Sequence, residues 1–209
     1  EICARYGKPE EASQLLLCNY LNNLGEVLFY ERQGLSNYIL LDIDWVTTAI
    51  YGVTTNQRMI DEHGRFTKDE VIGIWKQKGI TAKRDHDLLL QLLQLDAFEL
   101  CWRMGGTDKF LTPSLFSAQR PEAEPLAPSL GLRLVTGYLP GRLLTQTIVR
   151  LHDRVKLEAY WRYGVYVRRG ECRAALLRPV GADYLEIRVE GPSPDNYSLM
   201  QLVYDEVET

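Results

Sequence analysis

The sequence predicts an α+β protein: a helical, winged-helix-like N-terminal subdomain, then a C-terminal antiparallel sheet with helices on one face. A leucine-dense helical pattern at 85–96 runs directly into a hairpin pattern at 98–112, which is the order of a winged-helix unit. A proline-rich polar stretch at 117–129 then indicates a semi-rigid linker. Beyond it the elements follow the order β-α-β-β-β-α, which is typical of an α+β unit. We therefore divide the chain into subdomains at 1–116 and 130–209.

The N-terminal subdomain begins with a helix and a hairpin. Pro9 suits the start of the first helix, and Gly25 suits its end because glycine accepts the positive φ of a helix stop. Apolar strand patterns at 27–30 and 38–41 flank a polar segment and predict a hairpin. Asp44 can then cap a short helix through its side-chain oxygen.

Two further helices precede the second hairpin. Thr67 and Glu70 form a capping box, which should start a helix that ends at Gly79. The leucines of the next helix, 85–96, should face the core. Its exposed stripe should contain Asp87, Gln91 and Gln94.

That exposed stripe holds no cation, which bears on the kind of partner. Proteins that read DNA with a helix and a wing neutralise the phosphate backbone with Lys and Arg. We therefore expect this unit to contact protein and not nucleic acid. A winged-helix DNA-binding regulator is the alternative, and it would need a basic recognition surface.

The C-terminal subdomain is expected to start with a strand at 132–138 and a helix from Pro140 to Val155. The polar face of this helix should hold Arg142, Gln146, Arg150 and Arg154. Strands at 160–168 and 171–178 follow, and Arg169-Gly170 should be the turn between them.

That turn predicts a register in which Arg168 faces Glu171 and Tyr166 faces Arg173, both favourable cross-strand pairs. A strand at 183–190 and a helix from near Asn196 complete the subdomain.

Composition excludes several classes of function. The chain of 209 residues is 45% hydrophobic and 25% charged, which is ordinary for a globular protein. Residues 1–120 carry 13 Lys and Arg against 16 Asp and Glu, and the rest carry 11 against 12, so neither half should attract nucleic acid. No apolar run approaches the roughly 20 residues of a membrane helix, and no export signal is present. Four scattered cysteines favour a reduced, cytoplasmic protein, and a start at Glu1 suggests a fragment of a longer one.

No catalytic or metal-binding constellation stands out. The turn at 105–109 lacks the spacing of a phosphate-binding loop. His63, His86 and His152 are distant in sequence from one another and from every cysteine, so we expect no metal site. His86 lies at a helix start, where we expect a solvated side chain. We predict that this chain is not itself an enzyme and holds no cofactor.

Charged and aromatic side chains offer two interpretations each. The arginine stripe of helix 140–155 is either a solvated face or a contact surface, and the shortage of lysine in this half favours contact. Together with the hairpin, it gives these candidates for a partner surface: Arg142, Gln146, Arg150, Arg154, Tyr166, Arg168 and Arg173. Large aromatics on strands are core residues by default. Near a strand end they can instead reach a docking surface, and the candidates for that role are Phe110, Tyr160 and Trp161.

Five segments together resemble one family. They are 40–46 (Leu-Leu-Asp-Ile-Asp-Trp-Val), 64–66 (Gly-Arg-Phe), 92–100, 110–115 (Phe-Leu-Thr-Pro-Ser-Leu) and 160–166 (Tyr-Trp-Arg-Tyr-Gly-Val-Tyr). In this order they resemble the COR domain ("C-terminal of Roc") of bacterial-type Roco proteins, the family of the leucine-rich-repeat kinases. The likeness extends over both halves of the chain.

The resemblance implies a non-catalytic module that packs on an adjacent Ras-like GTPase domain, Roc, which would hold GTP or GDP and Mg²⁺ in the parent protein. It implies a homodimer formed through the C-terminal subdomain and coupled to the nucleotide state of Roc, which makes the partner-surface residues above the candidates for the dimer interface. By position in the motifs, Phe110 and Trp161 would lie near the Roc–COR junction. The kinase branch has Tyr at the position of Phe110, so a hydroxyl contact is absent here.

Overall fold

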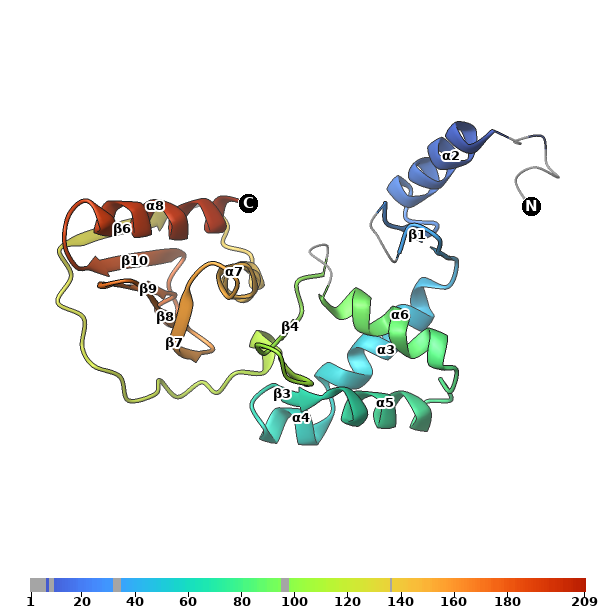
Figure 1. Cartoon of the computed structure of the whole chain (residues 1–209), viewed down its shortest axis with the longest axis horizontal. Coiled ribbons are helices and arrows are strands. Elements are labelled where there is room, and N and C mark those ends of the chain that lie inside the picture. Colours follow the sequence, from blue (N-terminus) through green and yellow to red (C-terminus); the bar gives the residue numbers. More distant parts are fainter. Residues whose placement is uncertain (1–6, 8–9, 32–34, 95–97, 136) are drawn as a thin grey trace.

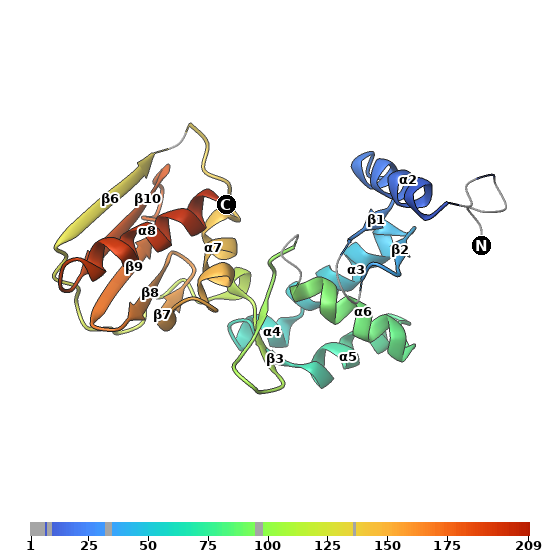
Figure 2. The ribbon, with the colours of Figure 1, turned by 45° about the horizontal axis from the view of Figure 1, so that its top comes forward.

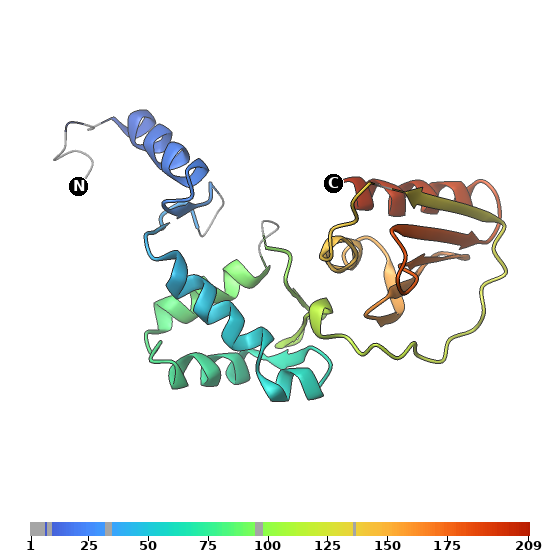
Figure 3. The same cartoon turned by 180° about the vertical axis from the view of Figure 1, so that it is seen from behind.

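The computed structural model describes Gly7 and residues 10–31, 35–94, 98–135 and 137–209. Two units lie side by side in Figure 1: a helical N-terminal unit and a C-terminal unit built on a five-stranded sheet. The antiparallel sheets and the helices confirm the predicted α+β class. Figure 3 shows the long segment before β6 passing around the outside of the C-terminal unit.

The first described helix, α2 (Glu11–Asn23), projects away from the rest of the N-terminal unit (Figure 1). Gly25 has a φ of +76° just beyond it, as expected for a helix stop. Pro9, which should open this helix, lies outside the described residues. The predicted hairpin is present, because β1 (Leu28–Phe29) pairs antiparallel with β2 (Ile39–Leu40).

Helix α3 (Ile43–Thr54) corrects one prediction about caps. The cap is Asp42 and not Asp44, because the backbone N–H of Trp45 donates to Asp42 Oδ1 at 2.8 Å. Asp44 lies inside the first turn, where its negative charge still suits the helix dipole. Both residues were possible caps in sequence, and the extended backbone at Asp42 decides between them.

The capping box at Thr67 and Glu70 is confirmed. It starts α5 (Lys68–Gln77), which follows the short α4 (Gln57–Asp61). The next helix, α6 (Lys83–Gln94), begins two residues earlier than expected, so two cations lie in its first turn. Its buried side chains form most of the N-terminal core with α3 and α5. They are His86, Leu88, Leu89, Leu90, Leu92 and Leu93.

The second hairpin is a three-stranded sheet in the order β3-β5-β4. Its strands are β3 (Arg65–Thr67), β4 (Trp102–Arg103) and β5 (Lys109–Leu111), and the 3₁₀ turn η1 (Pro113–Leu115) follows. Sequence analysis missed β3 because three residues are too few to show alternation. Gly64 allows the third strand to approach: its φ is +82°, and a Cβ there would lie 2.3 Å from Thr112 O.

The C-terminal unit is an antiparallel sheet in the order β6-β10-β9-β8-β7. The helices α7 and α8 cover one face of it, as Figure 2 shows for α8. Buried apolar residues alternate along β10 at Leu185, Ile187 and Val189, as predicted. The elements are β6 (Leu130–Val135), α7 (Leu143–Leu151), β7 (Lys156–Trp161), β8 (Gly164–Arg169), β9 (Cys172–Leu177), β10 (Tyr184–Glu190) and α8 (Asp195–Glu208).

The predicted register of the β8–β9 hairpin is wrong by two residues, because the turn lies one residue later than expected. The turn is Gly170-Glu171, so Arg168 faces Arg173 and Tyr166 faces Ala175. Gly170 has a φ of +61°, which fits the first position of this turn. The error arose because two adjacent dipeptides contain the same glycine, and both give a two-residue loop.

A second small cluster lies on the sheet face opposite the helices. Trp161, Tyr166 and Ala175 are buried there, and Ala123 and Leu126 of the proline-rich segment pack against them. The segment therefore lies against the sheet as a strap, over residues 117–129, and is not a free spacer. This strap is held at both ends: Arg162 N donates to Ser117 O at 2.8 Å, and Ser129 N donates to Val189 O at 2.9 Å.

Candidate interface surfaces and the junction of the two units

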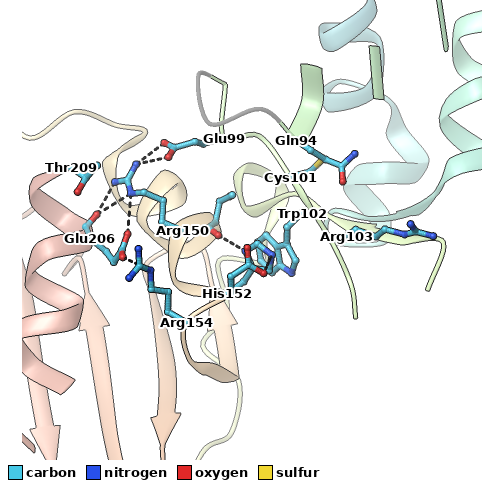
Figure 4. A pocket seen from close by; sticks show the side chains of 12 residues that line it. Gln94, Glu99, Cys101, Trp102, Arg103, Arg150, His152, Arg154, Glu206 and Thr209 are labelled. Carbon is cyan, nitrogen blue, oxygen red and sulfur yellow. Dashed lines mark hydrogen bonds and ion pairs between the residues drawn. The ribbon is translucent and has the colours of Figure 1, made fainter. Parts of the chain in front are cut away.

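An ion-paired arginine joins the two units (Figure 4). Arg150 Nη1, on α7, lies 2.7 and 2.6 Å from the two carboxylate oxygens of Glu99, a residue of the N-terminal unit. Arg150 Nε and Nη2 also donate to the backbone carbonyl oxygen of Glu206 in α8, at 3.1 and 2.8 Å. The Arg150 and Glu99 side chains are only 16% and 9% exposed, so little water screens their attraction.

Glu99 is held in an uncommon backbone conformation, with a φ of +45°. Such a conformation in a residue other than glycine costs free energy and persists only where surrounding contacts fix it. Here the paired guanidinium of Arg150 is such a contact. The junction therefore combines backbone strain in one unit with a charge in the other.

An aromatic seam continues the junction. The Trp102 ring stacks on His152 with centroids 5.2 Å apart and meets Phe116 edge-on at 6.4 Å. Phe116 stacks on Tyr160 at 4.6 Å, and Arg65 Nη2 donates to the Tyr160 hydroxyl at 3.2 Å. The N-terminal unit supplies Trp102 and Arg65. The C-terminal unit supplies His152, which follows α7, and Tyr160 of β7. A cleft of about 710 Å³ lies beside this seam and is lined in part by Arg154, Glu206 and Thr209.

Arg173 forms a second cluster beneath the strap. Its guanidinium binds Glu158 at 2.8 Å, Glu190 at 2.9 Å and Glu124 at 3.6 Å, and its side chain is 8% exposed. Arg168 also pairs with Glu158, so one carboxylate lies between two arginines that face each other across β8 and β9. The register of β7 shifts between Leu157 and Ala159, which leaves Glu158 as the extra residue of a bulge.

This arrangement shifts the acidity of Glu158. Burial raises the pKa of Glu158, but hydrogen bonds from Arg168 and Arg173 outweigh it and hold the pKa below its ordinary value. The same carboxylate raises the pKa of Arg173, so this guanidinium stays charged.

A lowered folded-state pKa makes a testable contribution to stability. Replacing Glu158 with Gln should lower the free energy of unfolding at neutral pH, because a favourable charge is lost. The wild-type advantage is present above the ordinary carboxyl pKa of 4.5 and is lost as pH falls through the lower folded value. Urea denaturation at several pH values measures this difference.

Glu26→Gln, an exposed site, is the matched control and should show no such pH-dependent difference. An equal destabilisation by Glu158→Gln at neutral and strongly acidic pH would contradict this account of Glu158.

Trp161 lies inside the protein and not on a free surface. Its ring is 5% exposed and packs against Tyr166 with centroids 5.6 Å apart. Arg120 of the strap lies over both rings, at 5.5 and 5.2 Å from their centroids. Gly164 makes room for the indole, since a Cβ there would come within 2.7 Å of Trp161 Cζ2.

The other two predicted contacts of an adjoining domain also lie in packed positions. Phe110 is 5% exposed and stacks on Phe66 with centroids 5.5 Å apart, in the N-terminal core. Tyr160 lies in the aromatic seam described above. Contact of these residues with another domain stays a prediction, and their packing within this chain is the role that the structure describes.

The predicted dimer residues fall into two groups. Arg150, Arg173 and Tyr166 are turned inward, against Glu99, Glu158 and the strap. Arg154 and Arg168 keep 61% and 36% of their side chains exposed, although both pair with carboxylates. Arg142 is exposed and Gln146 is partly exposed. Helix α7 is shorter than the expected 140–155, so Arg142 and Arg154 lie beyond its ends. The predicted arginine stripe is therefore divided, and only its outer members keep accessible surface for a partner.

His86 corrects the prediction of a solvated histidine. It is 4% exposed, its Nε2 lies 2.8 Å from Ile80 O, and its ring stacks on Trp75. The contact with a carbonyl oxygen requires the tautomer that is protonated at Nε2. His86 lies three, four and seven residues before Leu89, Leu90 and Leu93, which places it on the buried face of α6.

Three other functional features concern metal binding, membrane insertion and a reactive thiol. In that part of the chain, no group of three or more His, Cys, Asp or Glu side chains is arranged to hold a metal ion. Nor does any helix there have the length and apolar character to cross a membrane. The thiol of Cys101 is buried, and burial raises its pKa to about 12, so it is a poor nucleophile.

Sequence reasoning missed Glu99, Glu206 and Glu158 as partners of these arginines. Glu206 occurs in a segment expected to be a helix, and Glu158 lies in the short connection expected between the helix at 140–155 and the strand at 160–168. A single acid gives no signal in either place. Glu99 lies inside an apolar strand pattern, so an acidic residue between apolar neighbours was the one sequence signal for a buried ion pair.

Comparisons with known proteins agree with the two-unit architecture. The family described as "C-terminal of Roc, COR-A domain" matches residues 1–116, and the one described as "C-terminal of Roc, COR-B domain" matches residues 127–209. A Roc-COR-CHAT protease of Runella zeae is 25% identical over 173 residues, which cover 81% of this chain and 18% of that protein. The probable serine/threonine-protein kinase pats1 of Dictyostelium discoideum is 24% identical over 179 residues, which cover 78% of this chain and 6% of the kinase.

A solved structure of Methanosarcina barkeri Roco2 RocCORdC bound to GDP is 22% identical, with a TM-score of 0.44 over 51% of this chain and 33% of that one. The chain spans less than a fifth of the length of the two relatives above. The two family matches together cover most of its residues, on either side of the strap. The chain belongs to the C-terminal-of-Roc (COR) family of Roco proteins, with a COR-A domain followed by a COR-B domain.

Proposed function

We propose that this chain is a non-catalytic module that packs on an adjoining Roc GTPase domain and couples its nucleotide state to homodimerisation. The exposed apolar stripe on α2 carries the proposal. Leu16, Tyr20 and Leu24 follow one another at intervals of four residues and are 71%, 59% and 57% exposed. A row of three large apolar side chains on one helix face is typical of a contact surface.

The position of the stripe favours Roc as its occupant. The family is by its description C-terminal of Roc, and α2 is the first described helix of the COR-A domain. Two apolar side chains of the neighbouring α3 region are also exposed. They are Leu41, just before the N-cap of α3, at 76%, and Tyr51, near the end of α3, at 60%. An adjoining domain seated on this end of COR-A would remove these apolar groups from water.

Arg150 and the aromatic seam support the coupling role. A domain bound to COR-A can affect COR-B only if the two units respond together, and the Glu99–Arg150 ion pair and the Trp102–His152 stack connect them. COR-B then provides the homodimer contact, for which Arg142, Gln146, Arg154 and Arg168 keep accessible surface.

The α2 stripe gives a direct test. Leu16→Ser and Tyr20→Ser should each weaken binding of the parent's Roc domain to this chain by roughly 1–2 kcal/mol, because exposed apolar anchors are lost. Calorimetric titration measures the affinity. Val180→Ser, which alters a side chain 77% exposed in COR-B, is the matched control and should bind Roc like the wild type.

Light scattering on the same samples measures self-association, and we expect a dimer at high concentration. A chain that stays monomeric at high concentration and does not bind its own Roc domain would overturn the proposed function. The DNA-binding alternative gains little support from α6: its exposed side presents Asp87, Gln91 and Gln94, and the exposed cations Lys83 and Arg84 lie in its first turn alone.

A further inference from the structure

A second cleft, of about 420 Å³, lies where three segments meet: η1 of COR-A, the start of α7 and the turn between β7 and β8. It brings together the two most characteristic sequence motifs of the chain. Pro113 and Ser114 come from the Thr-Pro-Ser segment, and Arg162 and Tyr163 come from the Tyr-Trp-Arg segment. Neither motif is explained by the core alone, because Ser114 and Arg162 are exposed.

Three arginines converge on this cleft without an acidic partner. Arg142, Arg162 and Arg178 line it, and no Asp or Glu is among its lining residues. Within the described part of the chain, none of the three lies within 4.0 Å of a carboxylate oxygen. Five other arginines of COR-B do have such a partner: Arg150, Arg154, Arg168, Arg173 and Arg188. The charges at this cleft are therefore left uncompensated in a chain whose formal net charge is −4.

Three further polar groups at the cleft can donate hydrogen bonds: the Arg178 guanidinium, the Ser114 hydroxyl and the backbone N–H groups at the start of α7. Arg178 Nη1 approaches Gly141 O at 3.5 Å, a neutral partner that leaves its charge unbalanced. The exposed Ser114 hydroxyl has no hydrogen bond to another described residue. No side chain caps the N-terminus of α7, whose N-cap position is Arg142. An acceptor-rich anion would match all of these groups.

We propose that this cleft binds the dianionic group of a phosphate monoester. A phosphate monoester carries up to two negative charges and three acceptor oxygens, whereas a carboxylate carries one charge and two oxygens. Three guanidinium groups exceed what a single carboxylate requires, and their planar donor sets suit phosphate oxygens. Because Ser114 belongs to COR-A and the arginines to COR-B, the bound group would bridge the two domains. The proposal does not depend on Roc binding.

Inorganic phosphate is the first probe, added to the whole 209-residue chain at constant ionic strength. We expect the thermal midpoint to rise by roughly 3–6 °C at about ten times the dissociation constant. Arg162→Gln and Arg178→Gln should each weaken phosphate binding by roughly 10-fold to 100-fold, as expected for one lost charged hydrogen bond. Arg84→Gln, which removes the same charge at a side chain 77% exposed on α6, should bind phosphate like the wild type.

Circular dichroism establishes that each variant is folded before its affinity is compared. A midpoint that does not rise above that in an equal ionic strength of chloride would overturn the proposal. So would an equal loss of affinity in all three variants, because that would indicate a general effect of net charge.

Two organic probes identify the source of the phosphate group. One is a short peptide with a single phosphoserine, and the other is a nucleoside monophosphate. Tighter binding of either one than of inorganic phosphate supports the proposal and identifies its source. Inorganic sulfate is the comparison ion. If the phosphopeptide and the nucleoside monophosphate both bind no more tightly than sulfate, the proposal is contradicted.

Discussion

Replacing Arg150 with Met is expected to lower the free energy of unfolding by about 3–5 kcal/mol, because it leaves Glu99 as a buried charge without its partner. The Glu99 side chain is only 9% exposed, so water cannot replace the lost guanidinium. Met keeps the length and apolar stem of Arg150, so the loss reports the charge and its hydrogen bonds. Urea denaturation measures the free energy, and its slope reports whether the two domains still unfold together.

Arg103→Met is the matched control. Arg103 is 52% exposed and pairs at 2.6 Å with Asp108, which is 78% exposed, so its loss should cost less than about 1 kcal/mol. Adding Glu99→Gln to Arg150→Met removes the orphan charge and should restore part of the stability. A cost for Arg150→Met as small as that of Arg103→Met would refute a stabilising role for the Glu99–Arg150 pair.

The elements that the sequence predicted well carry a local signal. The capping box at Thr67 and Glu70 involves groups three residues apart, and the alternation of Leu185, Ile187 and Val189 follows from one buried sheet face. Both are decided by neighbours in the chain. The α+β class follows from the order of such elements, which is why it was confirmed.

Features that depend on distant partners were not predictable in the same way. The stripe of Arg142, Gln146, Arg150 and Arg154 is regular in sequence, yet its members have different surroundings in the fold. Arg150 pairs with Glu99, 51 residues earlier, whereas Arg142 lines the second cleft together with Arg178. Helical periodicity shows which face a residue occupies but not what lies opposite it, and that depends on how COR-A docks against COR-B.

The strap shows the same limit. Proline-rich composition predicts an extended segment between domains, and residues 117–129 are extended. Composition cannot show that the segment lies against β8 and β9, because the contacts come from Arg173, Tyr166 and Trp161 far along the chain. The two-residue register error also matters here, since the true pairing places two arginines opposite each other, and Glu158 pairs with both of them.

Replacing Trp161 with Ala is expected to lower the free energy of unfolding by about 3–5 kcal/mol, the usual cost of removing a buried large aromatic ring. The ring is 5% exposed and supports both Tyr166 and Arg120 of the strap. Loss of the ring should therefore also release the strap from the sheet. A glutamyl endopeptidase should cleave after Glu122 of the strap faster in the variant, and denaturation with timed proteolysis measures both effects.

Release of the strap distinguishes two possible roles of Trp161: contact with an adjoining domain, or support of the strap. If Trp161 acts only as a contact of the adjoining Roc domain, its replacement should weaken Roc binding while stability and cleavage after Glu122 stay unchanged. If it supports the strap, as its burial indicates, stability and protection fall even in the absence of Roc. Tyr197→Ala, at a ring 60% exposed on α8, is the control for loss of an aromatic side chain and should change neither quantity. Trp161→Phe should keep most of the protection, because a smaller ring still fills part of the space between Gly164 and the Arg120 guanidinium.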